Sequence, residues 1–129
     1  MKANTTAQLI DSENKIIESI IQGFEERIFR TQLLYDNIPK DNEHLLPSLT
    51  EDLQTCYAGS CYFKALLGPV SEEEKALANE FKPENFCNAF NSWFHLEDTS
   101  EEGYKKDFEL REKISYWLKL QELSISPTF

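Results

Sequence analysis

The sequence predicts an all-α fold, a single compact bundle of about five helices with a long N-terminal helix. Apolar residues recur at three-, four- and seven-residue intervals, which is the period of a helix with one buried face. Only four glycines and five prolines interrupt the 129 residues, and no stretch of β-branched residues alternates with period two. A chain of this length forms one core, so we expect a single domain over residues 1–129, with the tail 124–129 frayed.

The first helix is expected from about Thr5 or Thr6 to about Asn37. At 1.5 Å per residue its roughly 30 residues span about 45 Å, which exceeds the diameter of a small domain. We therefore expect the helix to overhang, to bend near Gly23, or to pack against a second copy of the chain. Its apolar stripe comprises Leu9, Ile10, Ile16, Ile17, Ile20, Ile21, Phe24, Ile28, Phe29, Leu33, Leu34 and Tyr35.

The second helix follows a connection over residues 38–47 that is bounded by two prolines. Ser48 and Glu51 have the spacing of a capping box and predict the helix start. Gly68 and Pro69 predict its end, through a left-handed glycine and a residue that cannot continue the helix. The expected inner face comprises Leu49, Leu53, Cys56, Tyr57, Phe63 and Leu67.

Ser71 and Glu74 form a second capping-box pattern, which predicts a short third helix ending before Pro83. Pro83 suits the first turn of a fourth helix over residues 83–95. On that helix Phe86, Phe90 and Trp93 share one face and are interpreted as core, whereas Phe94 and His95 point elsewhere.

The fifth helix is expected to begin with Thr99 and Glu102, a third pair at capping-box spacing. Its apolar residues are Tyr104, Phe108, Leu110, Ile114, Trp117, Leu118 and Leu120. On the first helix, Glu25 and Glu26 lie beside Arg27 and Arg30, and the i,i+4 spacing of Glu26 and Arg30 indicates a solvated ion pair. We interpret this charged stretch as surface.

The charge balance limits the class of partner. The chain has 13 basic and 23 acidic residues, a net charge of −10. A field of this sign repels phosphate backbones and anionic membranes and attracts basic protein surfaces. We expect a protein partner with a basic surface and neither direct nucleic-acid binding nor membrane binding, although acidity that serves only solubility is an alternative.

The compartment is expected to be the cytoplasm. The opening residues 1–15 contain no apolar signal-peptide region, and no apolar run approaches the ~20 residues that cross a bilayer. The three cysteines are an odd number, which fits a reducing environment better than a disulfide framework.

Metal binding and catalysis find no support in the sequence. The five candidate metal ligands are His44, Cys56, Cys61, Cys87 and His95. Positions five apart on a helix differ by about 140° in direction, so Cys56 and Cys61 cannot readily hold one ion. Neither histidine follows a glutamate by three residues, as a di-iron bundle requires, and phosphate-binding glycine loops are absent. We expect buried thiols, no metal, no cofactor and no enzymatic activity.

Two acidic clusters are the candidate partner-binding surface. If they converge, and if Phe94 or Tyr104 borders them, they could imitate the spaced phosphates of a nucleic acid. The sequence then predicts an inhibitor or immunity-type protein that blocks a basic nucleic-acid-handling partner. The first cluster is Glu72, Glu73 and Glu74, and the second is Glu97, Asp98, Glu101 and Glu102.

Three alternatives stay open. The clusters can be two unrelated solvated helix starts. The protein can be a self-associating structural or regulatory adaptor that dimerises through the apolar stripe of the first helix. A small helical enzyme or ligand binder that uses a cysteine or a histidine is the third class.

Overall fold

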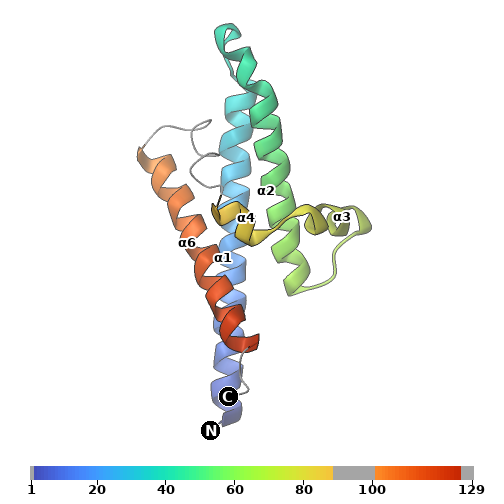
Figure 1. Ribbon diagram of the computed structural model, residues 1–129, viewed down its shortest axis with the longest axis vertical. Helices are drawn as coiled ribbons and strands as arrows, with labels where there is room; N and C mark the ends of the chain where they lie inside the picture. The colour runs from blue at the N-terminus through green and yellow to red at the C-terminus, as the bar shows by residue number, and fades with distance from the viewer. Residues whose placement is uncertain (1, 89–100, 126–129) are drawn as a thin grey trace.

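Three long helices lie along one another: α1 (Lys2–Asp36), α2 (Leu46–Leu67) and α6 (Glu101–Ile125). In the computed structural model, α1 packs against both α2 and α6, and its N-terminal part continues beyond the end of α2 (Figure 1). The structure describes the backbone of residues 2–88 and 101–125 and the side chains of 13–88 and 105–122. Within these ranges the fold is an all-α bundle of five α-helices and one 3₁₀ helix, as the sequence predicts.

The start of α2 differs from the prediction. A 3₁₀ helix, Lys40–Leu45, occupies the connection, and α2 begins at Leu46 without a side-chain cap. The predicted capping box of Ser48 and Glu51 is therefore wrong. Pro47 lies in the first turn, where a missing N–H costs no helical hydrogen bond, so the helix can begin before it.

The end of α2 is at the predicted position but has another geometry. Gly68 has φ 178° and ψ −173°, which is extended backbone, so the predicted left-handed cap is wrong. The Gly68 N–H donates to the Lys64 carbonyl at 3.1 Å, and Pro69 follows. An extended residue before a proline ends the helix by itself, because proline disfavours helical backbone in its predecessor.

The predicted capping box of α3 (Glu72–Glu80) is confirmed. The Ser71 hydroxyl accepts from the Glu74 N–H at 3.2 Å, and the Glu74 carboxylate accepts from the Ser71 N–H at 3.0 Å. This helix packs against α2 and projects sideways from the three long helices (Figure 1). The next helix, α4 (Pro83–Asn88), packs against α6. The predicted continuation through Phe90, Trp93, Phe94 and His95, and the Thr99 cap, lie outside the described residues.

The core is centred on aromatic rings from several elements. The ring of Phe24 on α1 lies 6.2 Å from Phe63 on α2, 5.6 Å from Phe81 and 5.5 Å from Phe86 on α4. Trp117 on α6 lies 5.0 Å from Phe63. The predicted burial is confirmed for Ile17, Ile20, Phe24, Leu49, Leu53, Cys56, Phe63, Phe86, Cys87, Leu110, Ile114 and Trp117.

Several residues of the predicted apolar stripes lie outside this core. Phe29 is 65% and Leu33 48% exposed on α1. Phe29 follows the buried Phe24 by five positions, which turns it about 140° away. A single buried face cannot cover so wide a stripe. The other exposed members are Leu34, Tyr35, Tyr57, Leu67 and Phe108.

The contact between α1 and α2 depends on Gly59. A Cβ atom at this position would lie 2.5 to 2.9 Å from three atoms of the Phe24 ring. We expect Gly59→Ala to destabilise the fold by about 1–3 kcal/mol, because the fully buried ring cannot move aside without strain. Chemical denaturation measures this loss of unfolding free energy.

Gly23→Ala is the matched control. It adds the same methyl to a helix interior, but its closest contact is 2.8 Å to Cδ1 of Leu110, the end of a flexible side chain. Alanine also favours a helix by about 0.5–1 kcal/mol over glycine, so we expect a net change below about 1 kcal/mol. Equal losses in the two variants would contradict the packing argument.

Candidate functional site

A buried ion cluster joins the three long helices. The Arg27 guanidinium on α1 lies 2.5 Å from the Asp107 carboxylate on α6 and 3.4 Å from the Asp52 carboxylate on α2. Arg30 also pairs with Asp107 at 2.6 Å, and the Thr31 hydroxyl donates to Asp52 at 3.3 Å. The side chains of Arg27, Asp52 and Asp107 are at most 2% exposed. The cluster is sealed inside the bundle, so its first role is structural.

Asp52 is the weakly paired member of the ion cluster. Burial raises the pKa of this carboxyl from an ordinary 3.8 to about 6, and the nearby Arg27 and the Thr31 hydrogen bond only partly offset that effect. The reason is geometric, since Arg27 approaches Asp107 much more closely than Asp52. The Asp107 charge further raises the Asp52 pKa.

The prediction that Arg27 belongs to a solvated surface is wrong. Arg27 and Thr31 follow Phe24 by three and seven positions, so all three occupy the buried face of α1. Asp52 precedes the buried Cys56 by four positions, and Asp107 precedes the buried Leu110 by three. This helical spacing was the sequence signal that these charged residues lie on buried helix faces. Only the contact between the three helices shows that their opposite charges compensate one another.

The cysteines are buried and unlinked. All three are free thiols, as expected, and burial raises the pKa of Cys56, Cys61 and Cys87. Each therefore stays a thiol at neutral pH, and a thiol is a weak nucleophile. Within the described part of the chain, three or more His, Cys, Asp or Glu residues are nowhere grouped to hold a metal ion.

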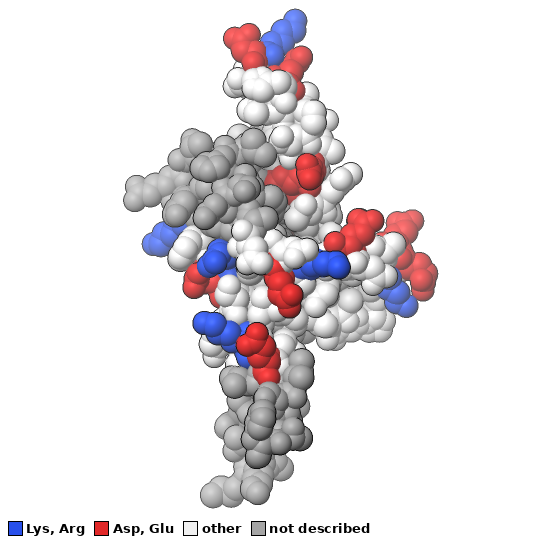
Figure 2. Space-filling model, in the orientation of Figure 1, with Lys and Arg blue, Asp and Glu red and all other residues white. Residues whose placement is uncertain are grey.

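The first acidic cluster lies on α3. Glu72 and Glu73 are exposed at its start, and Glu72 pairs with Lys75 at 3.4 Å. Glu74 is committed to the capping box, whose hydrogen bonds from Ser71 lower its pKa. Carboxylates gather over α3 at one corner of the molecule (Figure 2). Glu72 and Glu73 are accessible at this surface, which we call the acidic corner, while Glu74 fixes the helix start.

The second acidic cluster is only partly placed. Phe94, Glu97 and Asp98 lie outside the described residues. Glu101, Glu102 and Tyr104 belong by backbone to the first turn of α6. That turn and α3 lie on opposite sides of the long helices (Figure 1). The backbone therefore does not bring these three residues next to Glu72, Glu73 and Glu74.

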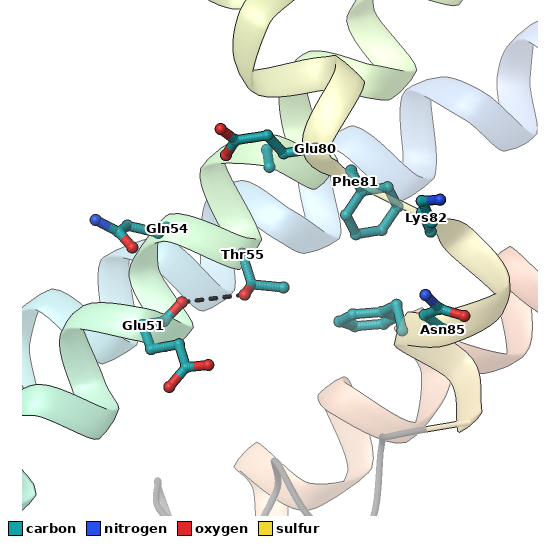
Figure 3. Close-up of a pocket in the computed structure, with 9 residues that line it drawn as sticks. Glu51, Gln54, Thr55, Glu80, Phe81, Lys82 and Asn85 are labelled. Carbon is teal, nitrogen blue, oxygen red and sulfur yellow. Dashed lines mark hydrogen bonds between the residues drawn. The ribbon is translucent and has the colours of Figure 1, made fainter.

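A groove lies beside α3 that the sequence did not reveal, and we call it the α2–α4 groove. Its volume is about 470 Å³. One wall is a face of α2, and the other is formed by the end of α3, the following linker and α4 (Figure 3). The residues that line it are Glu51, Gln54, Thr55, Ala58, Glu80, Phe81, Lys82, Asn85 and Phe86.

The floor of the α2–α4 groove is apolar and its rim is polar. Ala58, Phe81 and Phe86 are buried at 4 to 6% exposure. Glu51 and Glu80 are exposed, as are Gln54, Lys82 and Asn85. The Thr55 hydroxyl donates to the Glu51 carbonyl at 3.0 Å. The groove therefore offers a ligand mainly the carboxylates and amides of its rim, above an apolar floor of small exposed area.

The protein is thus an all-α bundle with a sealed ion cluster. On its surface, the acidic corner at Glu72 and Glu73 lies beside the α2–α4 groove. None of the helices that the structure describes has the length and apolar composition of a membrane span. The chain matches no protein-family model, no curated protein and no solved structure.

Proposed function

We propose that the protein is a non-enzymatic binding module that holds a protein partner through an acidic surface. In its most specific form it is an inhibitor or immunity-type protein that blocks a basic nucleic-acid-handling protein. The observation that carries the proposal is the acidic corner at α3. Residues 71–85 contain five carboxylates and two lysines, and α3 projects from the bundle (Figure 1).

Charge and accessibility support a basic partner. The whole chain has a net charge of −10, so its field accelerates encounter with a cationic protein and opposes encounter with nucleic acid. The side chain of Glu72 is 91% exposed, so it can pair with a partner without first leaving a buried contact. The proposed contact therefore centres on α3 and its neighbourhood rather than on the two converging clusters that the sequence suggested.

The test compares a charge reversal on α3 with a reversal elsewhere. A partner is captured from the source cells and purified, and its affinity is measured by titration calorimetry. We expect Glu72→Lys/Glu73→Lys to weaken binding at least about tenfold, because like charges then oppose each other at the contact. Glu74 is left unchanged because its replacement would remove the capping box.

Glu18→Lys/Glu122→Lys is the matched control, since it makes the same change in net charge at exposed positions of α1 and α6. We expect it to weaken binding less than about threefold, through the general field alone. The wild-type affinity should also fall between low and moderate ionic strength. A complex indifferent to salt and to both reversals would contradict the proposal.

A second candidate function is self-association through α1. The exposure of Phe29 and Leu33 favours it, because these residues form an apolar strip on the helix side that faces away from Phe24. This interface would be apolar and insensitive to salt. Sedimentation at micromolar concentration distinguishes the two candidates, since a monomer at every concentration excludes the adaptor.

A further inference from the structure

We propose that the α2–α4 groove receives an arginine side chain of a basic protein segment. This inference rests on the proposed function and names the chemical group that the acidic surface recognises. The groove adjoins the end of α3 (Figure 3), so a segment bound at the acidic corner can reach it.

The floor suits the flat, weakly hydrated guanidinium group. The ring centroids of Phe81 and Phe86 lie 5.7 Å apart, and both rings contact the fully buried Phe24 ring. The two rings are thus fixed before any ligand arrives, and fixed groups bind with a smaller ordering cost. Phe81 and Phe86 are each 6% exposed, so a guanidinium would contact the small exposed part of each ring while its alkyl stem covers the neighbouring apolar surface. The buried Ala58 leaves room between the two walls.

The rim attracts a cation at the end of α3. A helix C-terminus carries partial negative charge from its free carbonyls, and α3 has no basic residue in its last turn. Glu80 adds a full negative charge at this end, where the dipole disfavours it. Glu51 lies across the groove on α2. A guanidinium between these carboxylates would be attracted by both of them, and it would offset the repulsion between Glu80 and the negative end of the α3 dipole.

The other side of the rim orients the bound segment. Lys82 and Asn85 lie together on the linker and α4, on the side away from Gln54 and Glu80 (Figure 3). Their amine and amide can donate hydrogen bonds to main-chain carbonyls. The segment would therefore place its backbone toward Lys82 and Asn85 and direct its arginine toward the carboxylates. A volume of about 470 Å³ accommodates one side chain of this kind with its backbone outside.

Fluorescein-labelled hexaarginine is the probe, and fluorescence anisotropy at low salt measures its Kd. We expect Glu51→Gln/Glu80→Gln to raise this Kd at least about tenfold, since both carboxylates that would pair with the guanidinium are lost. Glu18→Gln/Glu122→Gln changes the net charge equally at exposed positions away from the groove and should raise it less than about threefold. All four glutamates are exposed, so circular dichroism should show both variants folded.

Hexalysine tests the aromatic floor. Lysine has the same charge but no planar group, so we expect the wild-type protein to bind hexalysine at least about threefold more weakly than hexaarginine. Nuclear magnetic resonance provides the location, because bound peptide should shift the Asn85 side-chain amide and the Thr55 signals. Absence of hexaarginine binding, equal losses in the two double variants, or equal affinity for both peptides would overturn the inference.

The two proposals can fail separately. In one outcome, Glu72→Lys/Glu73→Lys abolishes partner binding but Glu51→Gln/Glu80→Gln does not change hexaarginine binding. The proposed function then stands, and the assignment of the groove to arginine is wrong. Selective hexaarginine binding in the groove without any charge-dependent protein partner leaves the arginine site and removes the proposed function.

Discussion

Arg27→Met is expected to lower the free energy of unfolding by about 3–5 kcal/mol, the usual cost of removing one partner from a buried ion pair. Arg27 is the cation shared by Asp52 and Asp107, and none of the three side chains is more than 2% exposed. Asp107 keeps Arg30, whereas Asp52 keeps only the Thr31 hydroxyl and the Cys56 thiol among its described side-chain contacts. Urea unfolding near pH 7 provides the measurement.

Lys64→Met is the control for this variant. Lys64 pairs with Glu25 at 3.5 Å, and their side chains are 41% and 56% exposed. Water screens such pairs, which contribute about 0–1 kcal/mol, so we expect a loss below about 1 kcal/mol. If both variants lose equally little, the cluster does not hold α1 to its neighbours.

The triple variant Arg27→Met/Asp52→Leu/Asp107→Leu separates charge from packing. It removes the cation together with both carboxylates that need it, and apolar replacement of a whole buried ion cluster is often neutral or stabilising. Arg30 then loses Asp107, but its side chain is 18% exposed and can reach water. We expect the triple variant to recover most of the stability lost by Arg27→Met.

The second large effect is a pH dependence that originates from Asp52. Its pKa is about 6 in the folded protein against an ordinary 3.8, so between these values the folded state binds the proton more strongly than the unfolded state. Stability from this group is fully present below about pH 4 and is lost as the pH rises through 6. A difference of roughly two pKa units corresponds to about 3 kcal/mol.

Comparison with Asp52→Asn isolates this titration. The amide keeps the shape and an acceptor oxygen for Thr31, but it does not ionise. The stability of the wild type relative to Asp52→Asn should fall by about 2–3 kcal/mol between pH 4 and pH 7. The other carboxylates cancel because both proteins contain them. A difference that is constant with pH, or that grows as the pH rises, would contradict the assigned cause.

The contacts that hold the bundle together and the proposed binding surfaces lie in different parts of the protein. The ion cluster and the aromatic core connect α1, α2 and α6 inside the bundle. The acidic corner and the α2–α4 groove lie outside, on α3, α4 and one face of α2. Charge changes on exposed glutamates should therefore affect binding without loss of the fold.

Much of the architecture is encoded locally. Helix-period apolar residues, the Pro83 break and the Ser71–Glu74 capping box each act within one or two turns, so the sequence alone determined an all-α bundle, its long first helix and the start of α3. The same local logic misplaced the start of α2, because Leu46 and Pro47 can begin a helix as readily as Ser48 can cap one.

The pairing of the interior charges and the position of the candidate site could be determined only from the tertiary structure. Arg27, Asp52 and Asp107 come from three helices, and each by itself resembles a surface residue. Only their contact makes burial of all three energetically acceptable. The α2–α4 groove likewise joins positions 51–58 to 80–86. Periodicity determined which face of each helix is apolar, whereas only the approach of helices distant in sequence decided which charges are paired inside and where a groove opens at the surface.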